Sequence, residues 1–86
     1  MQVEYYTEDI KFISDLLRWA PLEDIIKKLN NGATSPECGD FMLCELTNDE
    51  ITELVGYLSL EANHNKSKRI SSRACDVADY LEVQIR

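Results

Sequence analysis

Apolar side chains recur every three or four residues through the second half of the chain, with one short polar interruption at residues 63–66. This period places them on one face of a helix, so the pattern predicts two amphipathic helices, one on each side of the interruption. Because the connection is so short, the two helices should pack antiparallel as a hairpin. The apolar positions are Ile51, Leu54, Val55, Leu58 and Ala62 in the first helix and Ile70, Ala74, Val77, Leu81 and Ile85 in the second.

Both C-terminal helices carry a signal for where they begin. Thr47 is followed three residues later by Glu50, and in such a capping box each side chain accepts a hydrogen bond from the backbone N–H of the other residue. Ser67 precedes the last helix and is expected to accept a hydrogen bond from a backbone N–H in its first turn. The two helices should therefore start directly after Thr47 and Ser67.

The first half of the chain predicts a strand and two further helices. Residues 2–6 alternate in the manner of a strand and contain valine and tyrosine, which favour strands. Thr7 is expected to cap a first helix whose apolar stripe runs as far as Ala20. Pro21 ends that helix and suits the first turn of a second one, whose apolar face lies within residues 22–29.

A turn, a loop and a second strand connect these helices to the C-terminal pair. The Asn-Asn-Gly sequence at 30–32 should supply the left-handed residue that commonly ends a helix. Residues 33–39 are expected to form a loop, and the apolar run at 40–46 has the length of a strand.

The elements then follow the order β-α-α-β-α-α in one compact domain, residues 1–86. Two short strands are marginal alone, so helices must cover one face of their sheet. The sequence therefore predicts an α+β fold dominated by helix. Its core is expected to contain Ile13, Leu17, Ile26, Leu43, Leu54, Leu58, Val77 and Leu81.

The ends and the cysteines of the chain indicate a protein of the cytoplasm. The N-terminus lacks the basic start and apolar run of a signal peptide, and no apolar stretch is long enough to span a bilayer. An odd number of cysteines, three, in a chain without an export signal favours reduced thiols. We therefore expect no membrane association.

The charge of the protein is negative and uneven. The formal net charge is −7. Residues 1–61 hold thirteen acidic and four basic side chains, a balance of −9, whereas residues 62–86 hold three acidic and five basic side chains, a balance of +2. A nucleic-acid-binding protein neutralises phosphates with lysine and arginine, so the overall charge disfavours direct nucleic-acid binding. The acidic part instead suits a partner protein with a basic surface.

The sequence shows no pattern typical of an enzyme, a metal site or a cofactor site. Structural zinc sites bring ligands in close pairs, whereas Cys38 and Cys44 are six positions apart and His64 and Cys75 are single. Cys75 falls beside the apolar stripe of the last helix, where a small buried thiol is common. Phosphate-binding loops and hydrolase motifs are also missing from the sequence. We therefore expect neither catalysis nor a cofactor.

A basic cluster lies where the last helix begins, and it has two interpretations. Its members are Lys66, Lys68, Arg69 and Arg73. These cations would lie at the C-terminal end of the preceding helix, where positive charge is stabilising. Alternatively, they would form with the free N–H groups of the next helix a site for phosphate or nucleic acid, over residues 64–73.

The acidic residues and tyrosines of the C-terminal helices form the other candidate surface. They are Asp49, Glu53, Tyr57, Asp76, Asp79 and Tyr80. Carboxylates at these positions either keep the surface solvated or attract a basic partner, and exposed tyrosines suit an interface. The sequence therefore favours a small interaction protein, an inhibitor or regulator. Its size and charge are similar to those of phage and mobile-element accessory proteins that act on nucleic-acid-binding host proteins. The sequence leaves the oligomeric state open, including a homodimer.

Overall fold

The computed structural model describes residues 1–37 and 39–86. It confirms an α+β fold dominated by helix, with a helical hairpin at the C-terminus. The elements are β1 (Gln2–Tyr6), α1 (Thr7–Leu16), α2 (Glu23–Asn30), β2 (Ala33–Thr34), β3 (Phe41–Glu45), α3 (Asn48–His64) and α4 (Lys68–Val83). Apart from the two-residue β2, their order is the predicted one.

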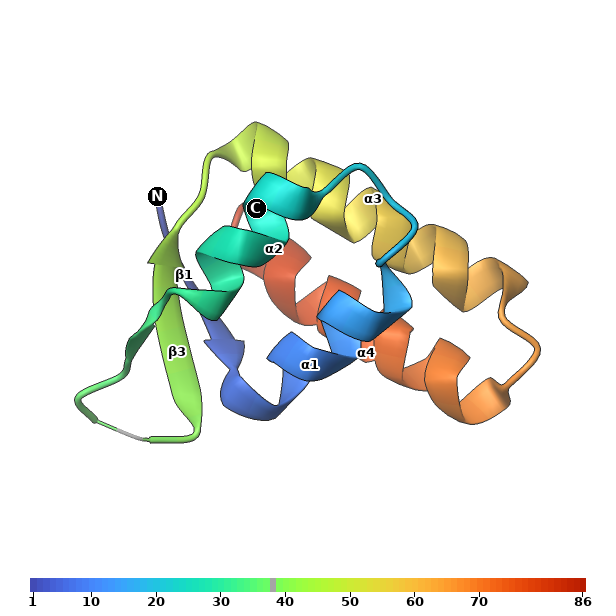
Figure 1. The fold of residues 1–86 in the computed structure, drawn as a ribbon, viewed down its shortest axis with the longest axis horizontal. Coiled ribbons are helices and arrows are strands. Elements are labelled where there is room, and N and C mark those ends of the chain that lie inside the picture. The colour runs from blue at the N-terminus through green and yellow to red at the C-terminus, as the bar shows by residue number, and fades with distance from the viewer. Residues whose placement is uncertain (38) are drawn as a thin grey trace.

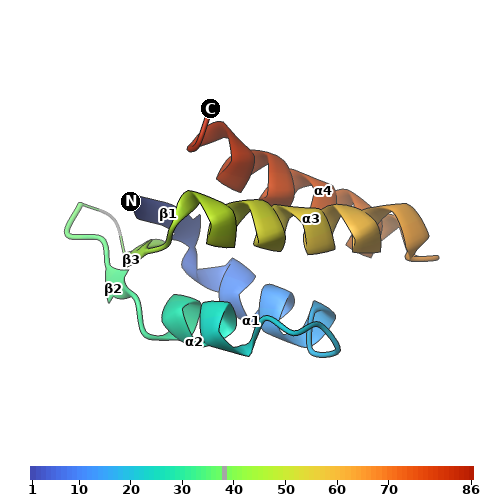
Figure 2. The same ribbon diagram turned by 90° about the horizontal axis from the view of Figure 1, so that it is seen from above.

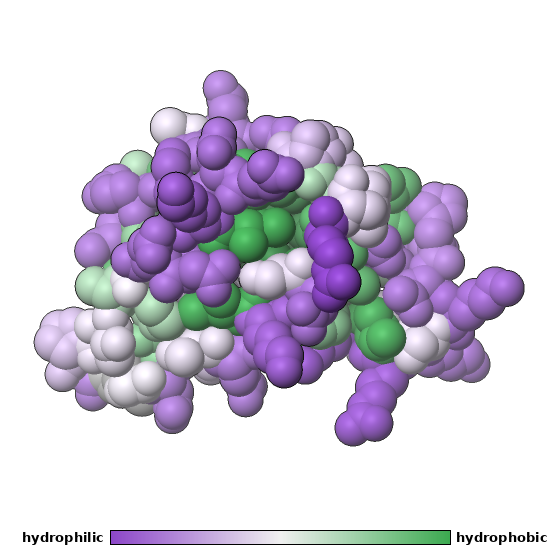
Figure 3. Space-filling view, in the orientation of Figure 1, coloured by the Kyte–Doolittle hydropathy of each residue, from purple (hydrophilic) through white to green (hydrophobic). Residues whose placement is uncertain are grey.

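The helices form two layers, and the sheet closes one end of the molecule (Figures 1 and 2). The long helices α3 and α4 run antiparallel side by side, and α1 and α2 lie together on one side of them. Both chain termini lie at the end that carries the sheet. On the face that carries α1 and α2, apolar side chains occupy a recessed centre framed by polar ones (Figure 3). None of the helices in the described part of the chain has the length and apolar character needed to cross a membrane.

The predicted caps of α3 and α4 are present. The Glu50 N–H donates to Thr47 Oγ1 at 3.1 Å, and the Thr47 N–H donates to Glu50 Oε1 at 2.9 Å, which completes the capping box. The Ser67 hydroxyl oxygen accepts from the Ile70 N–H at 3.3 Å. A hydrogen bond from the Ser71 hydroxyl to the Ala62 carbonyl ties the two helices together beside their connection.

The core lies between the two helical layers and the inner face of the sheet. Of the predicted core residues, Ile26 and Leu43 are only half-buried, and the other six are buried. In α2, Ile25 and Leu29 point inward in place of Ile26. Leu43 pairs with Glu4 across the sheet and so lies on the face opposite the buried Val3, because successive strand residues point to opposite faces.

The sheet has three antiparallel strands in the order β1-β3-β2. Val3 and Tyr5 of β1 are buried against the helices. The strand β2 was expected to be part of a loop, and that prediction was wrong. Only two residues long, β2 pairs with Leu43 and Met42 of β3, and so short a segment carries no alternating pattern that would predict it.

Two boundaries of α1 differ from the prediction. Thr7 is the first helical residue and not the cap: Tyr6 takes the cap position without a side-chain hydrogen bond, and the Thr7 N–H donates to the Asp40 carbonyl at 2.8 Å. The helix ends at Leu16, four residues before Ala20. The residue that precedes proline is disfavoured in helical conformation, which accounts for Ala20, whereas residues 17–19 already form a turn.

The end of α2 also differs from the prediction, because no described residue adopts a left-handed conformation. Glycine is required at position 32 because a side chain there would clash with neighbouring atoms, and not because of the backbone angles of the residue. A Cβ at this position would overlap the Tyr5 hydroxyl oxygen and would lie 2.8 Å from the Leu43 carbonyl oxygen. The Tyr5 hydroxyl passes this point to donate to the Leu29 carbonyl at 2.5 Å. Burial raises the pKa of Tyr5 well above its usual value.

The free edge of β1 is covered by the side chain of Gln84. Gln84 Nε2 donates to the Glu4 carbonyl at 2.7 Å, and the Glu4 N–H donates to Gln84 Oε1 at 2.8 Å. The amide thus pairs with β1 as a neighbouring strand would, satisfying groups that otherwise invite another chain to add to the sheet. The C-terminus of α4 is thereby held to the N-terminal strand.

Candidate partner-binding surfaces

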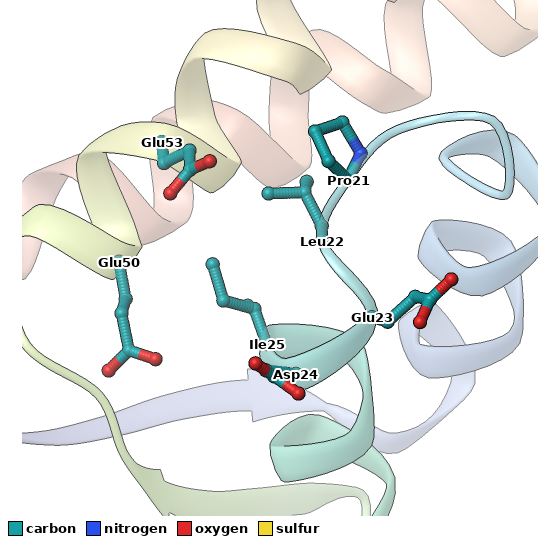
Figure 4. Close-up of a pocket in the computed structure, with 7 residues that line it drawn as sticks. All are labelled: Pro21, Leu22, Glu23, Asp24, Ile25, Glu50 and Glu53. Carbon is teal, nitrogen blue, oxygen red and sulfur yellow. The ribbon is translucent and has the colours of Figure 1, made fainter.

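An acidic hollow lies between the start of α2 and the first turns of α3. It is lined by Pro21, Leu22, Glu23, Asp24, Ile25, Glu50 and Glu53. In Figure 4 the two carboxylates of α3 face the apolar side chains of Leu22 and Ile25 across the hollow, whereas Glu23 points away from it. The hollow is open to solvent, so it suits the side chains of a macromolecule better than an enclosed small ligand.

One carboxylate of the hollow, that of Glu50, forms a salt bridge. Glu50 accepts a hydrogen bond from the Lys28 ammonium at 2.7 Å. This hydrogen bond, together with that from the Thr47 N–H, lowers the pKa of Glu50 below its usual value. Glu23, Asp24 and Glu53 form no salt bridge with any described residue. The hollow therefore presents the carboxylates of Asp24 and Glu53 without a salt bridge, and the carboxylate of Glu23 points away from it.

An aromatic pair adjoins the hollow on α3. Trp19, in the connection between α1 and α2, is 55% exposed, and its ring and that of Tyr57 pack edge to face, with centroids 5.5 Å apart and planes at 68°. The indole Nε1–H donates to Glu61 Oε1 at 2.8 Å. Glu53, Tyr57 and Glu61 are each four residues apart on α3, so they lie along one face of the helix. We call Trp19, Glu23, Asp24, Glu53, Tyr57 and Glu61 the acidic–aromatic surface.

Sequence analysis identified only part of this surface. Glu53 and Tyr57 were among the predicted site residues, whereas Trp19, Glu23, Asp24 and Glu61 were not. Glu23 and Asp24 lie in the first turn of α2, where carboxylates also stabilise the helix dipole. The spacing of Glu53, Tyr57 and Glu61 was a signal in the sequence that an acid–aromatic–acid row lies on α3.

The candidates on α4 belong to a different region. Asp76 and Tyr80 line a hollow with Tyr6, Glu8 and other residues, and that hollow shares no lining residue with the one that contains Glu53. Tyr80 packs on the ring of Tyr6 with centroids 5.2 Å apart, and burial raises the pKa of Tyr80. The structure therefore does not place the predicted acidic residues of α3 and α4 around one hollow.

Two further acidic candidates lie outside both hollows. Asp79 is exposed on α4, where its carboxylate accepts a weak hydrogen bond from the Cys75 thiol at 3.9 Å. Asp49 is exposed in the first turn of α3, where a carboxylate stabilises the positive end of the helix dipole.

One of the four residues of the basic cluster, Arg73, is engaged in a contact within the protein. The guanidinium of Arg73 pairs with Asp9 at 3.1 Å and lies 4.4 Å from the centroid of the Phe12 ring. Lys66, Lys68 and Arg69 are exposed and form no salt bridge with any described residue. They leave a smaller cationic patch at the start of α4.

The cysteines do not form a common site in the described part of the chain. Cys75 is exposed, so the expectation that it would be buried beside the apolar stripe was wrong; Ala74 and Ala78 occupy the buried face instead. Cys44 is half-buried, and burial raises the pKa of its thiol. Cys38 lies outside the described residues. Among residues 1–37 and 39–86, no three histidine, cysteine or acidic side chains gather as metal ligands would.

Of these regions, the acidic–aromatic surface has the most distinctive chemistry. It combines uncompensated carboxylates, which attract cations at long range, with a large exposed ring held in one orientation. The second hollow is partly neutralised by Arg73. In comparisons with known proteins, no family model, no curated protein and no solved structure matches this chain.

Proposed function

We propose that this protein is a non-enzymatic interaction module that binds a basic protein partner through its acidic–aromatic surface and thereby inhibits or regulates that partner. The exposure of Trp19 is the observation that carries the proposal. An indole that is 55% exposed and yet fixed by Tyr57 and Glu61 is ready to bury a large area on binding, with little further loss of side-chain entropy.

The charge around Trp19 supports the choice of partner. Glu23 and Glu53 form no salt bridge with any cation of the described chain, and Asp24 interacts with Lys28 only at longer range. Long-range attraction would speed the encounter with a basic surface, and the rings would then slow dissociation. Small size and acidity are typical of phage and mobile-element proteins that act on nucleic-acid-binding host proteins, and we extend the proposal to a partner of that kind.

The test uses the partner captured by the immobilised protein from a lysate of the source cells, then purified for binding kinetics. We expect Glu53→Lys to slow association and to reduce its dependence on salt, because it removes attraction on the binding face. Trp19→Ala should mainly speed dissociation. Asp79→Lys changes the net charge by the same amount as Glu53→Lys but lies on α4 outside the surface, so it should change neither rate appreciably.

Two results would contradict the proposal. In one, Glu53→Lys and Trp19→Ala bind with the rates of the unaltered protein. In the other, Asp79→Lys weakens binding as much as Glu53→Lys, which would show that net charge matters and this surface does not.

A second candidate function is phosphate or nucleic-acid binding through residues 64–73. The observation in its favour is that Lys66, Lys68 and Arg69 are exposed and unpaired within the described chain, beside a first turn of α4 that contains no acidic residue. Fluorescence anisotropy with labelled single-stranded and duplex DNA or RNA would test it. Binding that is lost on replacing Lys68 and Arg69 with glutamine would favour this function over the first.

A further inference from the structure

We propose that the corner formed by Trp19 and Tyr57 is a binding site for one arginine side chain, contributed by the basic partner. The inference rests on the proposed function and narrows it. It names the chemical group that the surface recognises and the two rings that recognise it.

The geometry of the rings suits a flat cation. The two planes are inclined at 68°, so the rings pack edge to face and do not cover each other by stacking, and Trp19 is more than half exposed while Tyr57 is half-buried. The hydrogen bond from the indole N–H to Glu61 and the edge contact with Tyr57 hold the indole in place. A guanidinium lying on the face of a tryptophan is attracted by the negative charge of the ring face.

The charges on both sides of Tyr57 favour a cation. Glu53 lies one helical turn before Tyr57, and Glu61 lies one turn after it. Glu61 accepts from two uncharged donors, Trp19 Nε1 at 2.8 Å and Asn65 Nδ2 at 3.4 Å. Neither carboxylate is paired with a cation of the described chain. A cation in the corner would therefore have an uncompensated carboxylate on each side.

The molecule already uses this combination of groups at another place. The guanidinium of Arg73 lies over the Phe12 ring at 4.4 Å and pairs with the Asp9 carboxylate at 3.1 Å. There the ring, the carboxylate and the guanidinium all belong to one chain. At Trp19 the ring and the carboxylates belong to this chain, and the guanidinium would come from the partner.

Arginine fits this corner better than lysine. The guanidinium is planar, stacks on aromatic faces and is less strongly hydrated than an ammonium group. Its several N–H donors can also reach a carboxylate while its plane remains on a ring. An ammonium group would gain the charge attraction of Glu53 and Glu61 but would lose the stacking.

The test exploits Trp19, the only tryptophan in the chain, which gives one indole N–H signal in the NMR spectrum. The probes are three capped pentapeptide amides, Gly-Ser-X-Ser-Gly, in which X is arginine, lysine or the uncharged isostere citrulline. We expect the arginine peptide to shift the Trp19 signal in a saturable way, with a Kd about two- to fivefold lower than that of the lysine peptide. Citrulline should produce little shift.

Variants assign the shift to the corner. Glu53→Gln and Tyr57→Leu should each weaken binding of the arginine peptide, whereas Asp79→Asn, on α4, should leave it unchanged. Circular dichroism before titration checks that Tyr57→Leu remains folded, and Glu53→Gln provides a test that leaves both rings in place.

Two outcomes overturn the inference. If the lysine peptide binds as tightly as the arginine peptide, the surface attracts cations in general and the corner does not select arginine. If no peptide shifts the Trp19 signal in a saturable way, the corner is not a binding site. In both cases the proposed function is tested separately, by the effect of Glu53→Lys on binding of the captured partner. A failure of this inference can therefore be distinguished from a failure of the proposed function.

Discussion

Replacing Gly32 with alanine should destabilise the protein through a steric conflict with Tyr5. The added methyl group would overlap the Tyr5 hydroxyl oxygen, and Tyr5 is only 2% exposed, so its ring cannot simply swing into solvent. Displacing the hydroxyl sacrifices its hydrogen bond to the Leu29 carbonyl, about 1 kcal/mol. Strain in the surrounding core adds about 1–3 kcal/mol. We therefore expect a loss of about 2–4 kcal/mol, against a total stability of about 4–13 kcal/mol for a domain of this size.

A double-mutant cycle identifies the hydroxyl as the cause. Tyr5→Phe alone should cost about 1 kcal/mol. In the Tyr5→Phe background, Gly32→Ala should cost about 1–2 kcal/mol, because the close approaches to the Leu43 carbonyl oxygen at 2.8 Å and to the ring carbon Cζ at 3.3 Å remain. Urea unfolding followed by circular dichroism measures all four proteins. Gly56→Ala is the control, since a Cβ there meets nothing within 4 Å and alanine favours helix by about 1 kcal/mol over glycine. Equal costs of Gly32→Ala in the two backgrounds would refute this explanation.

Further predictions concern the core, acid stability and the thiols. Leu54 is fully buried, so Leu54→Ala should reduce the free energy of unfolding by about 2–5 kcal/mol, measured by urea titration. Hydrogen bonds lower the pKa of Glu50 in the folded protein. The stability that the ionised Glu50 carboxylate contributes is therefore present above the unfolded pKa of about 4.3 and is lost as the pH falls through the folded pKa. Urea titrations across pH 2–7 should therefore show wild type more stable than Glu50→Gln near neutrality and this difference vanishing in acid. In a Cys38→Ser background, iodoacetamide should modify the exposed Cys75 faster than Cys44, whose pKa burial raises; mass spectrometry of peptides reads this out. Adding EDTA should leave Tm unchanged, and a fall of many degrees would reveal a structural metal.

The C-terminal half could be predicted because its signals are local and repeated. The capping box of Thr47 and Glu50 and the cap at Ser67 fix where α3 and α4 begin, and a long apolar stripe fixes which face is buried. Neither signal depends on the rest of the molecule. The short connection then leaves little choice but antiparallel packing.

The features that could not be predicted depend on contacts between distant segments. The pairing of β2 exists only because β3 lies beside it, and the need for Gly32 arises from the Tyr5 hydroxyl, which reaches it from β1. Gln84 covers an edge strand 80 positions away in sequence. Composition and periodicity do not report such contacts, because they describe one segment at a time.

Part of the candidate surface could be predicted from local spacing in the sequence, and part depends on contacts between distant segments. That Glu53 and Tyr57 share a face of α3 follows from their spacing. That Trp19 packs on this face, away from the core, follows from the early end of α1 at Leu16, which the apolar stripe did not reveal. Likewise, spacing alone could not show that Asp76 and Tyr80 line a separate hollow beside Tyr6.

The proposed binding function offers a reason for the distribution of charge that folding alone does not. Charge of one sign opposes the compact state through self-repulsion, and the structure relieves this at Glu50, through Lys28, and at Asp9, through Arg73. It does not relieve it at Glu53, which lies one turn from the aromatic corner. An uncompensated carboxylate beside an exposed and firmly held tryptophan contributes little to stability, whereas both gain favourable contacts when a cationic partner covers them. The same reasoning argues against a partner at the internal pair of Arg73 and Phe12, because the guanidinium already lies over the ring.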